Sequence, residues 1–159
     1  MRRPDFFTKL HEEGKLQIVD SSEEIEKAYL KKSESFLISA KLLINNDRLE
    51  ESVSMTYYSM YYMLLALLFR VGIKCENHSA SIILLEKIFN IDNSEISSAK
   101  KERIDKQYYI DFSITKKEVE ELIKKSEIFN SKILSFIRKL NSEKIVKFRM
   151  KMKKLLKQV

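Results

Sequence analysis

The stretch Met55–Phe69, MTYYSMYYMLLALLF, constrains the fold more than any other part of the chain. Only Thr56 and Ser59 interrupt its apolar and aromatic residues, and no charge follows before Arg70. A helix that is apolar on every side must be buried on every side. The run is shorter than the roughly 18 to 20 residues that cross a bilayer, and its Met, Leu and Ala content favours helix over strand. We therefore predict the central helix of a bundle, ending near Gly72, and no membrane span.

The composition limits both the fold class and the kinds of functional site. With 159 residues, the chain is long enough for one domain with a substantial core. Two glycines and one proline leave helix formers in the majority, which predicts an all-α class and excludes glycine-rich phosphate loops. The single cysteine, Cys75, excludes an internal disulfide and a cysteine-based zinc site. We expect no metal or other cofactor, no secretory signal and a cytoplasmic location.

Basic residues are concentrated at the C-terminal end of the chain. The net charge is +7, but the segment from Arg138 onward holds nine Lys or Arg residues and one Glu, a net charge of +8. The remainder of the chain is therefore close to neutral. This segment predicts contact with nucleic acid or with an anionic membrane surface. The side chains that we expect to contact nucleic acid are Lys144, Lys147, Arg149, Lys151, Lys153 and Lys154.

Helical periodicity and capping patterns divide the chain into three parts. Residues 1–20 form a leader that we expect to pack on the bundle, residues 21–141 form the bundle, and residues 142–159 form a basic amphipathic helical extension. Ser21 with Glu24, and Thr115 with Glu118, have the spacing of capping boxes. Short links between the helices favour an antiparallel up-and-down bundle of about five helices. These helices are expected near residues 23–46, 49–71, 78–89, 94–109 and 116–140, with a further helix near 143–157.

Four segments carry a resemblance to a known family. Thr56–Tyr62, followed by Ala66–Leu68, resembles the "AYYAMFH…AL" helix of the HEPN family. Gly72 and Asn77–Ser79 fall where that family has a glycine and a Lys-Thr-His-Ser-like turn. In addition, Arg103–Tyr108 is similar to the "R-x-x-A-D-Y" segment, and Thr115–Phe136 is similar to the closing helix. The resemblance covers roughly residues 23 to 140.

The resemblance implies a helical protein with an RNA- or nucleotide-related function. HEPN proteins are small helical proteins of bacteria and archaea that include metal-independent ribonucleases and their inactive relatives. Many are toxins that are paired with a minimal nucleotidyltransferase. Their nuclease signature is an Arg followed, after four to six residues, by a His, and two copies meet across a homodimer. Such chemistry needs a group that titrates near neutrality and a permanent cation for the phosphate.

The segment that begins at Arg103 departs from this signature. Tyr108 and Tyr109 follow Arg103, and no His does. A Tyr with a pKa of about 10 cannot act as a base at pH 7 without a large shift. Arg103 beside these tyrosines nevertheless suits a phosphate and an unstacked base. The alternative interpretation is that Arg103 forms a buried or interfacial ion pair.

The second candidate pair is Arg70 with His78. Seven residues separate them, one more than the family signature allows, and they flank a turn rather than share a helix. We interpret His78 first as a turn or capping histidine, with catalysis as the alternative. The candidate catalytic residues are therefore Arg103 and His78. The candidate ligand-binding residues are Arg70, His78, Arg103, Tyr108 and Tyr109.

Three functions are compatible with this sequence. The first is a non-catalytic nucleotide- or RNA-binding protein, homodimeric, that works with a nucleotidyltransferase partner. The second is a metal-independent ribonuclease toxin of a toxin–antitoxin pair, with an altered site. The third is a scaffolding bundle that its basic tail attaches to nucleic acid or to a membrane surface. Because no His follows Arg103, we expect binding rather than catalysis.

Overall fold

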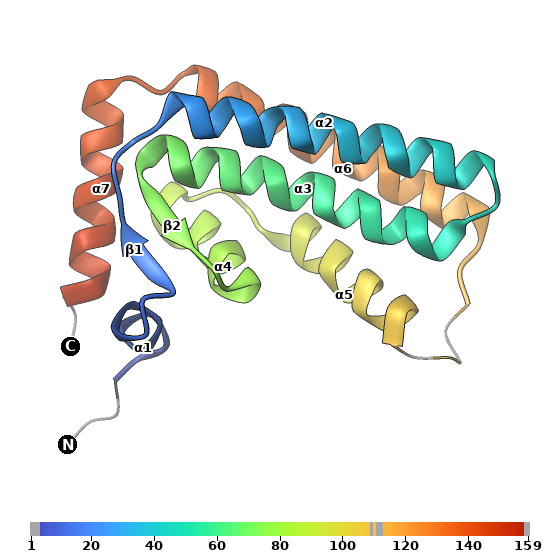
Figure 1. The fold of residues 1–159 in the computed structure, drawn as a ribbon, viewed down its shortest axis with the longest axis horizontal. Coiled ribbons are helices and arrows are strands. Elements are labelled where there is room, and N and C mark those ends of the chain that lie inside the picture. The colour runs from blue at the N-terminus through green and yellow to red at the C-terminus, as the bar shows by residue number, and fades with distance from the viewer. Residues whose placement is uncertain (1–3, 109, 111–112, 158–159) are drawn as a thin grey trace.

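The described part of the chain, residues 4–108, 110 and 113–157 of a computed structural model, is almost entirely helical (Figure 1). The predicted all-α class is therefore confirmed, with a two-stranded sheet as the only other regular structure among these residues. The elements are α1 (Phe6–Glu12), β1 (Leu16–Ile18), α2 (Glu23–Asn45), α3 (Leu49–Val71), β2 (Ile73–Cys75), α4 (His78–Phe89), α5 (Ser94–Tyr108), α6 (Lys116–Arg138) and α7 (Ser142–Lys157).

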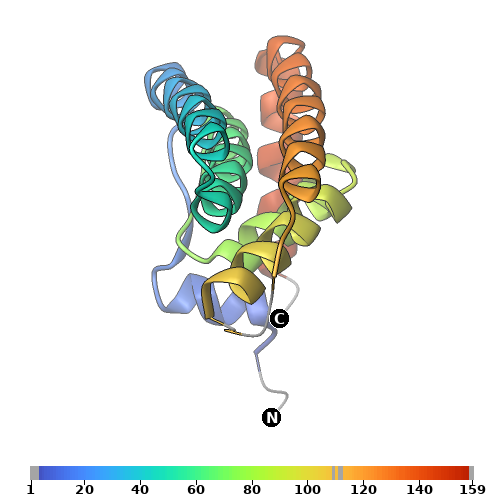
Figure 2. The ribbon, with the colours of Figure 1, turned by 90° about the vertical axis from the view of Figure 1, so that its right-hand side faces the viewer.

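Helix α3 forms the centre of the molecule, as its apolar sequence predicts. It lies antiparallel to α2 and also packs against α6 and α5 (Figures 1 and 2). Met60, Leu64 and Leu67 of α3 are fully buried in the main core. The helix ends where Gly72 adopts the left-handed conformation and its N–H reaches back to the carbonyls of Leu68 and Phe69. No helix among the described residues is both long enough and apolar enough to cross a bilayer.

The helix N-termini follow local capping chemistry, with two corrections to the sequence analysis. The Thr115–Glu118 capping box is present at the start of α6. At α2 the predicted box is wrong: Ser22 caps the helix, whereas the Ser21 hydroxyl donates to the backbone carbonyl of Arg70. Helix α7 begins at Ser142, one residue before the start that we expected, and the Asn141 side chain accepts from the N–H of Lys144. At both α2 and α7 two adjacent residues could have capped the helix, and tertiary contacts or loop geometry selected one of them.

A short antiparallel sheet joins the leader to the segment after α3, which the sequence analysis did not predict. Leu16 pairs with Cys75 and Ile18 pairs with Ile73. Leu16 and Ile73 are fully buried in the main core. The sheet therefore places the leader against the end of the central helix, and β2 carries the chain directly into α4.

Helix α7 lies across one end of the long helices (Figure 1) and is part of the core. Met152 is fully buried, Ile145 is buried, and Phe148 and Leu155 pack against the main cluster. The Arg149 guanidinium donates hydrogen bonds to the backbone carbonyls of Val19, Val71 and Gly72. The helix is therefore attached to the leader and to the end of α3 by both apolar and polar contacts.

Candidate functional site

His78 lies against the central helix at the start of α4. Asn77 caps α4, so His78 is its first residue. The His78 Nδ1 lies 2.8 Å from the Tyr57 hydroxyl oxygen, and the imidazole stacks on the Tyr61 ring with centroids 3.9 Å apart. Burial lowers the pKa of His78, and the positive charges of Arg103 and Lys100 lower it further. His78 is therefore mainly neutral at pH 7, held between two tyrosines and near two cations.

Arg103 reaches the same tyrosines from α5. Its guanidinium carbon lies 5.3 Å from the ring centroids of both Tyr57 and Tyr58. Its Nη1 donates to the Tyr58 hydroxyl at 3.3 Å. Cation–π contacts of this kind attract a guanidinium to the ring and limit its orientations. Arg103 and His78 thus meet on neighbouring rings of α3, although they belong to different helices.

Lys100 adds a second cation one helical turn before Arg103. Its ammonium donates to the hydroxyl of Ser79, the second residue of α4. Burial lowers the pKa of Lys100, and the charge of Arg103 lowers it further. The effect of Arg103 indicates that two positive charges are held close together, and the Lys100–Ser79 hydrogen bond places them beside the N-terminus of α4. That terminus adds the partial positive charge of the first N–H groups of a helix. We call Tyr57, Tyr58, His78, Lys100 and Arg103 the Arg103–His78 cluster.

The cluster is accessible from solvent on one side. Tyr57 is buried. The other members of the cluster are each half-buried: Tyr58, His78, Lys100 and Arg103. Burial strongly raises the pKa of Tyr57 and raises the pKa of Tyr61 to about 12, so both hydroxyls keep their protons at neutral pH. The group that titrates nearest to neutrality in the cluster is therefore His78.

Arg70 lies outside this cluster. Its guanidinium forms ion pairs with Glu23 at 2.9 Å and Glu26 at 3.6 Å, both on α2. Burial raises the pKa of Glu26, while the charge of Arg70 acts in the opposite direction. The structure thus gives Arg70 a role at the α2–α3 contact and brings Arg103, rather than Arg70, to His78.

The tyrosines that follow Arg103 cannot be placed in the site. Tyr109 lies outside the described residues, and so does the side chain of Tyr108, the last residue of α5. Ile110 lies beyond the end of this helix and is fully exposed. Within α5, Ile96 and Ala99 are both fully buried in the main core.

The basic residues of α7 separate into two groups. The residues Lys144, Lys147, Lys153 and Lys154 are exposed. Arg149 instead binds three backbone carbonyls, and the ammonium of Lys151 donates to the carbonyl of Ile88 at 3.1 Å. These contacts give Arg149 and Lys151 a structural role, although the residue Lys151 is also exposed to solvent.

Sequence reasoning missed Tyr57, Tyr58, Lys100 and Ser79 as members of the site. The tyrosines belong to an apolar stretch that any central helix would bury, so their hydroxyls gave no separate signal. Lys100 stands three residues before Arg103, the spacing that puts two side chains on one helix face. That spacing was the one available signal. Within the described residues, no group of three or more His, Cys, Asp or Glu side chains is placed to share a metal ion.

Comparison with known families gives a match over most of the bundle. The model of the HEPN domain matches residues 26–140, which include every member of the Arg103–His78 cluster. The chain belongs to the HEPN domain family. Two relatives are UPF0332 proteins of Pyrococcus horikoshii, 44% identical over 64 residues, and of Thermotoga maritima, 30% identical over 71 residues. These matches cover 40% and 45% of the chain, and 44% and 54% of the relatives. The chain thus spans about half the length of the relatives that it matches.

Proposed function

We propose that this HEPN protein binds RNA or a nucleotide through the Arg103–His78 cluster. The observation that carries the proposal is the meeting of Arg103 and His78, from α5 and α4, on the tyrosines of α3. Arg103 provides a permanent cation with several donors, which suits a phosphate. His78 provides a ring nitrogen whose protonation can respond to a bound phosphate.

Three features of the cluster support recognition of a phosphate group. Lys100 and Arg103 stand one turn apart on α5, and the N-terminus of α4 lies beside them through the Lys100–Ser79 hydrogen bond. A helix N-terminus attracts anions because its first N–H groups point outward. Tyr58 is half-buried, and its aromatic ring lies beside this phosphate site. Cations next to an aromatic ring are the common elements of single-strand recognition.

The assembly belongs to the same proposal. We propose a homodimer in which the clusters of two copies serve one RNA, and a nucleotidyltransferase as the partner. Family membership supports both features, because the HEPN resemblance implies them. The homodimer is also supported by the large share of aromatic side chains left half-buried on α2 and α3, such as Phe36 and Tyr62. The exposed lysines of α7 are proposed to add affinity for nucleic acid that depends on salt and not on sequence.

Replacing Arg103 with alanine is expected to weaken binding of single-stranded RNA by about 10-fold or more. The variant loses a charge-assisted contact, worth roughly 1.5–3 kcal/mol. Fluorescence anisotropy with a labelled oligonucleotide measures the affinity. The slope of log affinity against log salt concentration should fall by about 1, which corresponds to the loss of one phosphate contact. Arg48→Ala is the matched control, because Arg48 is exposed and pairs with Glu51 at the N-terminus of α3. Equal RNA affinities of the two variants would contradict the proposed binding site.

Sedimentation equilibrium on the same samples measures the number of chains in the assembly and so tests the proposed homodimer.

RNA binding is also expected to tighten as the pH falls from 7.5 to about 6. In the free protein the pKa of His78 is depressed, so the ring is neutral near pH 7. A phosphate beside the ring favours the protonated form, so binding takes up a proton and strengthens as the pH falls. His78→Gln should remove this pH dependence while Arg103→Ala retains part of it. A pH profile that is the same in the wild type and in His78→Gln would exclude His78 from the site.

Metal-independent RNA cleavage is the second candidate function. One observation favours it: His78 supplies, from α4, the group titrating near neutrality that the segment after Arg103 lacks. The test is incubation of single-stranded and structured RNA with the protein at pH 6 to 8 in the presence of a chelator. Cleavage that disappears in both His78→Gln and Arg103→Ala would establish this function. Binding without cleavage would support the non-catalytic function, which the sequence after Arg103 predicts.

A further inference from the structure

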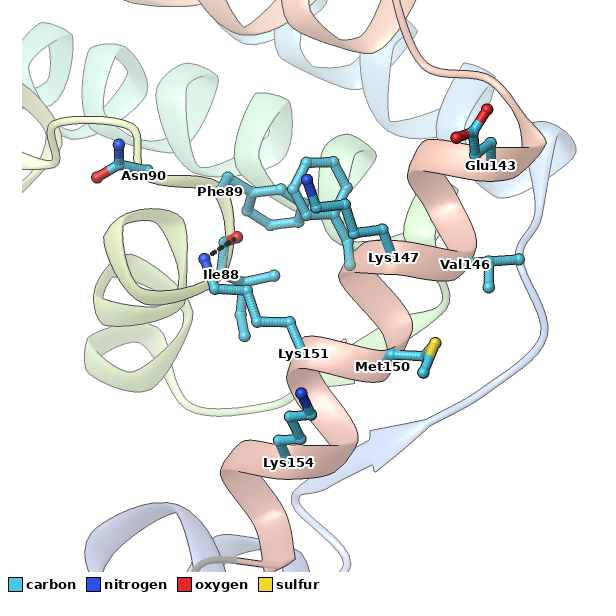
Figure 3. A pocket seen from close by; sticks show the side chains of 10 residues that line it. Ile88, Phe89, Asn90, Glu143, Val146, Lys147, Met150, Lys151 and Lys154 are labelled. Atoms are coloured by element: carbon cyan, nitrogen blue, oxygen red, sulfur yellow. Dashed lines mark hydrogen bonds between the residues drawn. The ribbon is translucent and has the colours of Figure 1, made fainter.

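A groove lies between the C-terminal end of α4 and the outer face of α7 (Figure 3). Its volume is about 480 Å³, within the range of roughly 300–1,000 Å³ that ligand sites occupy. Ile88 and Phe89 of α4 form one wall, and α7 forms the other. The ring centroids of Phe89 and Phe148 lie 5.0 Å apart with the ring planes tilted by 58°, so the floor is aromatic. The groove is separate from the Arg103–His78 cluster, with which it shares no residue.

The α7 wall presents apolar and basic residues on adjacent sides of the helix. Figure 3 shows Lys147 and Lys151 directed toward α4, while Val146 and Met150 project from the neighbouring side of α7. Val146 and Met150 are each 55% exposed and lie one turn apart on α7, as Ile38 and Leu42 do on α2. Lys154 continues the basic side, and Glu143 is the single acid on the groove. A binding partner must therefore cover an apolar strip and neutralise a row of lysines.

We propose that this groove docks an acidic amphipathic helix of a partner protein. The groove follows α7 from Glu143 to Lys154, about 16 Å at 1.5 Å per residue. That length matches roughly three turns of a helix lying alongside α7. The partner's apolar side chains would cover Val146, Met150 and the floor, and its carboxylates would face Lys147 and Lys154.

Two other anionic partners fit the groove less well. A membrane surface needs an exposed apolar face, but α7 turns Phe148, Met152 and Leu155 into the core and leaves only Val146 and Met150 as large exposed apolar groups. A nucleic acid would find lysines for its phosphates, yet Phe89 is buried in the floor and gives no free ring face for a base. Charge complementarity together with the apolar strip favours a protein helix.

The test uses two fluorescein-labelled synthetic peptides of about four helical turns. Both carry leucine at positions i, i+3 and i+7; one has glutamate at the flanking positions and the other has lysine. Fluorescence anisotropy with the whole 159-residue chain should give at least about tenfold tighter binding of the acidic peptide. Val146→Ser with Met150→Ser, and separately Lys147→Glu with Lys154→Glu, should each weaken that binding about tenfold. These residues are exposed, so the variants should fold, which circular dichroism checks.

Matched variants distinguish docking from general charge attraction. Lys117→Glu with Lys124→Glu changes two exposed lysines of α6 by the same charge and should leave peptide affinity unchanged. Arg103→Ala should also leave it unchanged, because docking does not depend on the proposed RNA site. Equal binding of the acidic and basic peptides, or equal losses in the α6 and α7 variants, would overturn the proposal. Displacement of the acidic peptide by phosphatidylglycerol vesicles would assign the groove to a membrane surface instead. Single-stranded RNA can compete through the α7 lysines alone, so Val146→Ser with Met150→Ser should leave RNA affinity unchanged; an equal loss of RNA and peptide affinity in that variant would assign the groove to RNA.

Discussion

Gly72→Ala is expected to lower the free energy of unfolding by about 3 kcal/mol or more. Gly72 ends α3 with φ +89°, a left-handed conformation that costs an L-residue about 1 kcal/mol. A Cβ at this position would also overlap the Arg149 guanidinium and the carbonyl oxygen of Val19. Because Arg149 binds the carbonyls around Gly72, displacing it also breaks hydrogen bonds that hold α7 in place. Urea denaturation followed by circular dichroism measures the loss.

Gly14→Ala provides the matched control for this prediction. Gly14 also has a positive φ, +72°, but a Cβ there would meet only the Gln17 side chain at 3.6 Å, an ordinary contact. The Gly14 variant should therefore lose only the conformational contribution, about 1 kcal/mol. Similar losses at the two positions would show that the close approach of Arg149 and Val19 to Gly72 contributes nothing to stability.

Removal of residues 142–159 is expected to prevent stable folding. If this segment were only an extension, as its basic amphipathic sequence predicts, its deletion would leave the bundle intact. The structure argues against that interpretation, because Ile145 and Met152 are buried and Phe148 and Leu155 pack on the core. At about 1.5–3 kcal/mol for each fully buried apolar side chain, the loss approaches the 5–15 kcal/mol that stabilise a typical domain. Thermal unfolding of the truncated chain should show a broad transition or none.

A charge-only variant separates the structural role of α7 from its proposed role in binding. Lys147, Lys153 and Lys154 are exposed, so their replacement by glutamine should leave the melting temperature nearly unchanged. Salt-sensitive binding to nucleic acid should nevertheless fall in this variant. For the truncation of residues 142–159, the contradicting outcome is a cooperative unfolding transition at the wild-type melting temperature. It would show that α7 is dispensable for folding.

The main architecture was predictable because it depends on local patterns. Met55–Phe69 has no polar face, so it could only become the central helix, and Gly72 supplied the left-handed residue at its end. The Thr115–Glu118 capping box was predictable because its hydrogen bonds join residues three apart. The adjacent serines Ser21 and Ser22 were not distinguishable in this way, because both can cap a helix and a carbonyl 49 residues away engages Ser21.

The sequence by itself determined the residue types of the candidate site, and only the tertiary structure decided which of them meet. It indicated Arg103 as a phosphate-binding cation and His78 as a turn residue, with no reason to join them. The three-residue strands were too short to show a period, yet β2 sets where α4 begins and so puts His78 on Tyr57. The packing of α5 against α3 then brings Arg103 to the same tyrosines. Local patterns specify helices because their interactions span about four residues, whereas this site joins side chains 21 and 45 residues apart.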